Sequence, residues 1–210
     1  MSRNEILVKA LTPDYIDHGL LVQMEKVDPN FKTQKELLDI VKDFIKTKKR
    51  IIYGSSAIQA LLKTKGGSIY TTSQEKRILP DYDVYTPESI EDSTELANLF
   101  HKKGYKYVRR IRATHASSVR VAVDFVFVAD FKYVAPKVYE QIPYKNIDVL
   151  LFAAPEFLKI DLYAGQLRPC TNVYRWRKDI PRIIEFENYF PMTHPSSSLY
   201  KTHMNKLTPS

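Results

Sequence analysis

The sequence contains a single cysteine, Cys170, among its 210 residues, so no disulfide can form within the chain. One cysteine favours a reducing, cytoplasm-like setting. Neither a second cysteine nor a histidine lies at ligand spacing from Cys170, which argues against a zinc site. No run of about 18 or more apolar residues occurs, so we expect no transmembrane helix and no membrane partner. Charged residues within the first apolar run also make the N-terminus unlike a signal peptide.

Basic residues are in excess, and the formal net charge is +8. This excess favours a polyanionic partner, although a solvated basic surface gives the same count. The distribution favours nucleic acid, because segment 101–120 has seven basic residues, no acidic residue, and Tyr105 and Tyr107 among them. The seven are Lys102, Lys103, Lys106, Arg109, Arg110, Arg112 and Arg120. Four of them, Lys106, Arg109, Arg110 and Arg112, are our candidates for binding RNA.

Hydrophobic spacing predicts strands and helices that mix in the first two thirds of the chain, with helices dominating the last third. The expected helices are 33–49, 57–63, 90–103, 156–164 and 173–190, the last interrupted or kinked near Pro181. The expected strands are 50–53, 81–85, 105–112 and 119–128. This pattern predicts an α+β fold, with a mixed sheet flanked by helices and a helical C-terminal part.

We divide the chain into four segments by composition and expected structure. They are an N-terminal arm (1–32), a catalytic domain (33–150), a helical segment that packs on it (151–190) and a flexible tail (191–210). The region between Thr64 and Pro80 is expected to be a loop or hairpin, because it opens with two glycines and is largely polar.

A strand, a Gly-Ser-Ser turn and a helix follow one another at Gly54, Ser55 and Ser56. Small residues allow the backbone to approach a phosphate, and a helix N-terminus offers free N–H groups and a partial positive charge. These three residues are therefore candidate nucleotide-binding residues. The same turn also occurs for purely structural reasons, and it is weak evidence alone.

Two carboxylates, Asp81 and Asp83, lie two residues apart in an expected strand, so both side chains project from one face. Such carboxylates repel each other unless a cation lies between them, and Mg²⁺ prefers oxygen ligands. A polar strand edge or a turn after Pro80 is the structural alternative.

The third acid that we select is Asp124, in the middle of the apolar stretch from Val121 to Val128. A buried lone carboxylate is unfavourable unless it is paired or binds a metal. An ion pair between Asp124 and Arg120 is the structural alternative. Taken together, Asp81, Asp83 and Asp124 are the candidate catalytic residues and metal ligands, because three acids suit a two-metal site.

The Gly-Ser turn, the Asp-x-Asp pair and the later lone Asp resemble the pattern of the polymerase-β-like nucleotidyltransferase superfamily. Within it, the chain most resembles the poly(A) polymerase catalytic subunits of poxviruses and other large DNA viruses, over roughly residues 35–190. The resemblance rests on Tyr53–Ile58, Asp81–Tyr85, Val123–Asp124, Lys159–Tyr163, Arg168–Pro169, Arg175–Lys178 and Arg182. The turn-to-Asp spacing is longer here than the usual pattern, with Thr64–Pro80 as the insertion.

The resemblance implies template-independent addition of adenylate from ATP to RNA 3′ ends, with Mg²⁺ or Mn²⁺ as cofactor. It implies that Gly54 and Ser55 contact the NTP phosphates and that Asp124 helps to deprotonate the primer hydroxyl. The implied setting is cytoplasmic, in a virus factory or a virion. Family catalytic subunits are longer, so we also expect a processivity partner or further domains.

Two other functional hypotheses remain open at this point. One is a different branch of the superfamily that modifies tRNA, a protein or a small molecule. The other is a non-catalytic RNA-binding scaffold subunit that has kept the fold. The basic segment favours RNA as the partner, and the presence of all three acids favours an enzyme.

Overall fold

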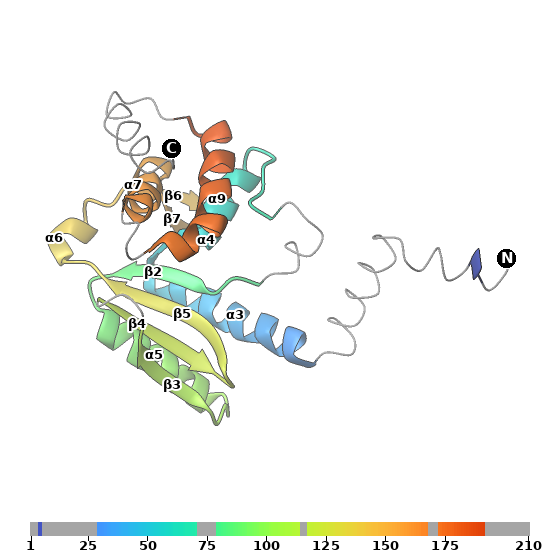
Figure 1. Cartoon of the computed structure of the whole chain (residues 1–210). Helices are drawn as coiled ribbons and strands as arrows, with labels where there is room; N and C mark the ends of the chain where they lie inside the picture. The colour runs from blue at the N-terminus through green and yellow to red at the C-terminus, as the bar shows by residue number, and fades with distance from the viewer. Residues whose placement is uncertain (1–3, 6–28, 71–78, 114–116, 168–171, 192–210) are drawn as a thin grey trace.

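The computed structural model describes residues 4–5, 29–70, 79–113, 117–167 and 172–191, and its centre is one seven-stranded sheet (Figure 1). The strands are β1 (Ile51–Tyr53), β2 (Tyr82–Thr86), β3 (Val108–Arg112), β4 (Ser118–Val123), β5 (Val126–Tyr133), β6 (Tyr144–Ile147) and β7 (Leu150–Ala153). The helices are α3 (Pro29–Lys48), α4 (Gly54–Lys63), α5 (Ser89–Lys102), α6 (Pro136–Tyr139), α7 (Pro155–Gln166) and α9 (Trp176–Tyr189), with a 3₁₀ turn at Val173–Arg175. The predicted α+β class is confirmed.

The sheet is mixed, with the strand order β3-β4-β5-β2-β1-β7-β6. β2 is antiparallel to β1 and parallel to β5, and β1 is parallel to β7. The central strands therefore come from distant parts of the chain, and the register between them determines which side chains meet on each face.

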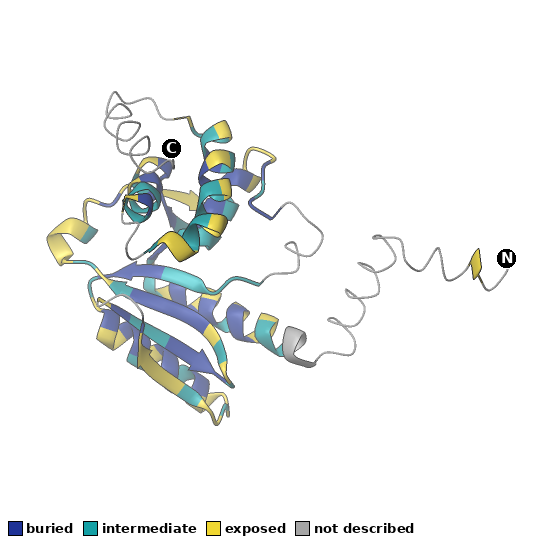
Figure 2. Cartoon of the chain, viewed as in Figure 1, coloured by how far each residue is buried: buried dark blue, intermediate teal, exposed yellow. Residues whose placement is uncertain are grey.

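One face of the sheet is covered by α3 and α5, which pack against β3, β4 and β5 (Figure 1). In α3, Leu37, Val41 and Ile45 recur at helical spacing and are fully buried, while lysines lie on the outer side (Figure 2). Phe44 meets Phe131 of β5 edge to face, with ring centroids 6.1 Å apart. Burial of this apolar stripe fixes α3 beneath the sheet.

The opposite face carries α4, α7 and α9 over the β1–β7 side. α9 continues through Pro181, and the irregular turn lies before it, at Val173–Arg175. The helix is therefore not interrupted at Pro181, and the alternative prediction of a kink there stays a prediction. α9 then packs against both α4 and α7, so it reaches the turn where β1 ends.

The single strand expected at 119–128 is wrong, because this segment forms a hairpin of β4 and β5. The turn residues Asp124 and Phe125 both have positive φ, 48° and 68°. Two such residues form the mirror-image turns that match the twist of paired strands. Sequence reasoning missed the hairpin because Asp-Phe lacks the glycine that usually marks this turn.

The sheet also continues where irregular structure was expected, because β6 and β7 pair as a second hairpin. The division of the chain at residue 150 stays a prediction; β7 begins there and pairs with β1. Most of the predicted arm and of the tail, and residues 71–78 of the predicted loop, lie outside the described residues. Across the described part of the chain, no helix is long and apolar enough to span a membrane.

Candidate active site

Gly54 joins β1 to α4 and brings the backbone against the carboxylate of Asp83. Its φ is +67°, and a Cβ built on it would lie only 2.2 Å from Asp83 Oδ2. Both the backbone conformation and the close approach therefore require glycine. The N-terminal N–H groups of α4 begin at this contact, so the helix end and the acid share one site.

Asp83 and Asp130 are neighbours across the sheet. The β1–β2 register places Tyr53 opposite Asp83, and the β2–β5 register places Asp83 opposite Asp130. Asp81 directly precedes β2, two residues from Asp83. Asp83 and Asp81 are partly buried and Asp130 is buried, so the structure brings three carboxylates together at this edge.

Asp124, the predicted third acid, is not among these three carboxylates. It lies in the β4–β5 turn, and its backbone N–H donates to the Tyr107 carbonyl. Six residues along β5 separate it from Asp130, roughly 15–20 Å at the rise of a strand. Asp130 was missed because both acids interrupt the same apolar stretch, and the signal that favours it is its position inside the buried run Val128–Phe131.

The crowding of these acids raises their pKa values. Burial, followed by repulsion from Asp81 and Asp130, raises the pKa of Asp83 from 3.8 to about 7. Burial and the charge of Asp130 also raise the pKa of Asp81. Clustered carboxylates with raised pKa values indicate a candidate functional site.

Arg120 forms an ion pair with the third carboxylate, that of Asp130. Its Nε and Nη2 donate to the two oxygens of Asp130, each at 2.6 Å, in a bidentate pair. The arginine that we considered as a partner of Asp124 thus pairs with Asp130. Among the described residues, no group of three or more His, Cys, Asp or Glu is arranged to hold a metal ion as it stands.

The donor set nevertheless fits a divalent cation in part. Asp81 and Asp83 are hard oxygen donors that form no ion pair with a basic side chain among the described residues, and their mutual repulsion favours a cation between them. Asp130 joins such a set only by exchanging Arg120 for the metal.

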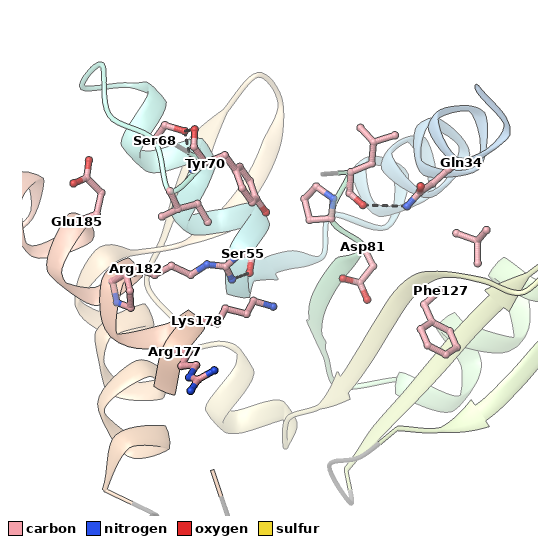
Figure 3. Close-up of a pocket in the computed structure, with 15 residues that line it drawn as sticks. Gln34, Ser55, Ser68, Tyr70, Asp81, Phe127, Arg177, Lys178, Arg182 and Glu185 are labelled. Atoms are coloured by element: carbon pink, nitrogen blue, oxygen red, sulfur yellow. Dashed lines mark hydrogen bonds between the residues drawn. The ribbon is translucent and has the colours of Figure 1, made fainter. Parts of the chain in front are cut away.

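A cleft of about 870 Å³ adjoins the acids (Figure 3). α9 forms one wall with Arg177, Lys178 and Arg182, and Asp81 lies on the facing side. The other lining residues are Gln34, Ser55, Ser68, Ile69, Tyr70, Leu79, Pro80, Val126, Phe127, Pro181 and Glu185. The cleft therefore places three cations on the α9 side, together with Glu185, and the carboxylate of Asp81 on the facing side.

Ser55 and Ser56, the predicted nucleotide-binding serines, have different surroundings. Arg182 Nη1 donates to Ser55 Oγ at 2.6 Å, inside the cleft. Ser56 Oγ instead donates to the carbonyl of Asp81 at 3.0 Å and ties α4 to the start of β2. Ser55 is thus placed to meet a ligand in the cleft, whereas the hydroxyl of Ser56 holds the acid-bearing strand.

None of the basic residues of α9 was among the predicted nucleotide-binding residues. Desolvation and the charges of Arg182 and Arg175 lower the pKa of Lys178. Arg175 itself pairs with Asp179, with Nε 3.0 Å from the carboxylate. The sequence signal was the spacing of these basic residues along one helix, which fits a solvated face equally well.

Comparison with known proteins places this site in a family. The sequence model of the poly(A) polymerase catalytic subunit matches residues 39–172. The chain belongs to the poly(A) polymerase catalytic subunit family. The matched range contains the β1–α4 turn and all three clustered acids, whereas Lys178 and Arg182 lie beyond its end.

Relatives in this family come from large DNA viruses. A protein of African swine fever virus, named as a poly(A) polymerase catalytic subunit, is 33% identical over 202 residues, covering 91% of this chain and 41% of its own length. A protein of the same name from Acanthamoeba polyphaga mimivirus is 27% identical over 189 residues, covering 89% of this chain and 32% of its own. The chain thus spans about two fifths of the length of the first relative.

A solved structure shares the fold. The crystal structure of the Megavirus polyadenylate synthase matches 91% of this chain and 38% of its own, with a TM-score of 0.76 and 27% identity. The mixed sheet and its helices are therefore the architecture of a poly(A) polymerase family member.

The predicted RNA-binding residues of this family member do not share one surface. Arg110 turns towards α5, where Nε donates to Ser93 Oγ and Nη2 to the Ile90 carbonyl, both at 3.2 Å. Alternation along β3 places Arg112 on the same side as Arg110 and Arg109 on the opposite side. Lys106 is exposed before the strand begins.

Proposed function

We propose that this chain transfers adenylate from ATP to the 3′ end of RNA without a template, using Asp81, Asp83 and Asp130. The observation that carries the proposal is the convergence of these acids beside a cleft whose opposite wall is cationic. Membership of the poly(A) polymerase catalytic subunit family supports the reaction class. The chain spans about two fifths of the relatives it matches, so the activity of the whole protein is part of the proposal.

The nucleotide is proposed to bind with its triphosphate between α4 and α9. The N–H groups that follow Gly54 and the hydroxyl of Ser55 face the cleft from one side. Lys178 and Arg182 face it from the other, where they would neutralise phosphate charge and orient the transferred group. The Arg182–Ser55 hydrogen bond already holds these two groups in place before a nucleotide arrives.

Asp81 and Asp83 are proposed to hold Mg²⁺ or Mn²⁺, with Asp130 as the third ligand. Divalent cations here would supply an activated attacking hydroxyl and neutralise charge on the triphosphate. Asp130 takes the role that the family resemblance assigned to Asp124, because the register places it beside Asp83. Arg120 orients Asp130 through their bidentate pair until the substrates assemble.

RNA, ATP and either a processivity subunit or further domains are the proposed partners. The net charge of +8 suits an RNA acceptor. The length of the family relatives, more than twice that of this chain, supports a contribution from additional domains to the grip on RNA.

The test is incubation with a radiolabelled short RNA, Mg²⁺ or Mn²⁺, and each NTP in turn. Extension with ATP is expected, and Asp83→Asn and Asp130→Asn should each reduce it by at least roughly 100-fold, because both remove charge that stabilises the transition state. Asp124→Asn is the matched control, an acid of the same type about six residues along the strand from Asp130.

Absence of incorporation with every NTP, from a folded protein, would overturn the proposal. Equal extension with all four NTPs would retain nucleotidyl transfer and reject adenylate specificity. Loss of activity in Asp124→Asn with full activity in Asp130→Asn would reverse the assignment of the third acid.

A further inference from the structure

Exposed aromatic rings and cations lie on the β4–β5 hairpin and on the neighbouring segment at β3, and the proposed chemistry uses only one of them, Arg120. We call Tyr107, Arg109, Arg120, Phe125 and Phe127 the aromatic track. The exposed fractions of Tyr107, Phe125 and Phe127 are 59%, 74% and 48%. Neighbouring aromatic rings that are this exposed commonly mark a surface that contacts a partner.

The members of the aromatic track form two contact groups, one around Phe125 and one around Phe127. The Tyr107 and Phe125 rings lie 5.9 Å apart, and Arg109 Cζ lies 5.1 Å from the Phe125 ring centre. Arg120 Cζ lies 4.4 Å from the centre of Phe127. Cations stacked on aromatic rings form flat surfaces that carry positive charge.

A β-bulge connects the aromatic track to the acids. The β4–β5 register shifts between Val121 and Ala122, so that Val121 opposes Ala129 while Ala122 opposes Phe127. Arg120 contacts both the Phe127 ring and the Asp130 carboxylate, which shows that these two side chains share a face. Bulges beside active sites commonly redirect a side chain in this way.

Phe127 also lines the cleft, on the side of Asp81 (Figure 3). The aromatic track therefore begins at the cleft and extends along the hairpin to Phe125 at its tip. α3 and α5 cover the other face of these strands, so the track lies on the face away from them (Figure 1).

Phe125 stands at a backbone position that suits glycine. Its φ of +68° disfavours a bulky side chain, and glycine follows Asp readily in this kind of turn. Backbone conformation alone does not mark a function, because Val149 has a φ of +63° and 62% exposure in the β6–β7 turn. What distinguishes Phe125 is its contact with Arg109 and Tyr107.

We propose that the aromatic track binds the single-stranded 3′ segment of the acceptor RNA and leads its terminal hydroxyl to Asp130. This inference rests on the proposed function, because it assigns the acceptor site of that reaction. Bases would stack on Tyr107, Phe125 and Phe127, and Arg109 would meet the phosphates, a combination suited to single strands of any sequence.

The chemistry of the aromatic track favours RNA over a protein segment. Arg109 stacks on the Phe125 ring and forms no ion pair among the described residues, whereas Arg120, stacked on Phe127, is paired with Asp130. The surface therefore presents one unpaired cation beside flat apolar rings. A covering protein segment would need an apolar face and would leave Arg109 desolvated without a carboxylate. Coverage by another part of a longer chain is the alternative that the experiment must exclude.

The test compares Phe125→Gly with Val149→Gly. Both substitutions remove an exposed side chain from a turn position with positive φ. Val149 precedes β7, whose first residues pair with the start of β1, so it lies away from Gly54 at the other end of β1. Neither change should unfold the protein, because glycine suits both positions. The probe is a fluorescein-labelled single-stranded oligoadenylate, whose binding is followed by fluorescence anisotropy without NTP.

Phe125→Gly is expected to weaken RNA binding roughly tenfold, the loss of one stacked base, and Val149→Gly to leave it unchanged. Tyr107→Ala should weaken RNA binding by a similar factor. Arg109→Ala should reduce the dependence of RNA affinity on salt concentration by about one phosphate contact. In the extension assay, Phe125→Gly should raise KM for RNA and leave KM for ATP unchanged.

Wild-type affinity in Phe125→Gly and Tyr107→Ala, or an equal loss in Val149→Gly, would overturn the inference and point to coverage by protein instead. If RNA binding depends on the aromatic track but no nucleotide is incorporated, the RNA-binding inference stands and the proposed reaction is rejected. The two failures are therefore distinguishable.

Discussion

The stability of the metal-free protein should fall between pH 5 and pH 8, because Asp83 must lose its proton while it faces two other carboxylates. Its pKa is about 7 in the fold against 3.8 without these surroundings. The folded state therefore holds a proton that the unfolded chain has already released. Stability from this group is complete below the unfolded pKa and is lost as the pH rises through the folded one.

These two pKa values correspond to a loss of roughly 2–3 kcal/mol of unfolding free energy between pH 5 and pH 8. Solvent reaches part of the carboxylate, so we expect roughly 2 kcal/mol. For a chain of this size, that is a decrease in Tm of roughly 4–8 °C. Mg²⁺ or Mn²⁺ should restore the Tm at pH 8 and have little effect at pH 5, since the ligand must be deprotonated.

Thermal unfolding at both pH values, with EDTA or with Mn²⁺, measures this effect. Asp83→Asn should flatten the pH dependence and remove the Mn²⁺ response, whereas Asp124→Asn, outside the cluster, should retain both. A metal-free Tm that does not fall from pH 5 to pH 8, together with no Mn²⁺ response in the wild type, would refute the reasoning.

Two further predictions concern the walls of the cleft. Gly54→Ala should lower kcat by at least roughly tenfold, because the added Cβ lies 2.2 Å from a carboxylate oxygen and the positive φ costs a further ~1 kcal/mol; extension kinetics that match the wild type would contradict this. Arg182→Ala should raise KM for ATP roughly tenfold with little change in Tm, because it removes the proposed charge-assisted contact to phosphate and the hydrogen bond to Ser55. Ile184→Ala, an exposed position on the same helix, is its matched control, and an equal effect there would contradict the assignment.

Local chemistry made several elements predictable from the sequence. The helix at α3 follows from its apolar spacing, and the end of β1 follows from Gly54. The pairing of Asp81 with Asp83 follows from two-residue alternation along one strand. Each of these depends only on residues that are close together in the chain.

The identity of the third acid depends on register, which the sequence does not specify. Asp124 and Asp130 interrupt the same apolar stretch, and only the Asp124–Phe125 turn separates a loop acid from a strand acid. The bulge that brings Phe127 to the face of Asp130 is likewise a property of strand pairing. Side chains that meet through long-range pairing were therefore the ones that sequence reasoning did not bring together.

The missed strand β7 has the same cause. Leu150–Ala153 is a short apolar run after an irregular stretch, and such runs do not distinguish a buried strand from part of a helix. Its role becomes clear only from its pairing with β1, residue 51 opposite residue 151.

That pairing has a consequence for how the protein folds. β1 lies inside the sheet between β2 and β7, and residue 151 of β7, its partner in that pairing, is about a hundred residues further along the chain. Closing so long a loop is entropically unfavourable before the contacts form, and non-local pairings of this kind slow folding. The β4–β5 hairpin, in contrast, joins adjacent residues and can form early. We therefore expect the carboxylate-bearing half of the sheet to form first and the cleft to close late, when β7 and α9 dock.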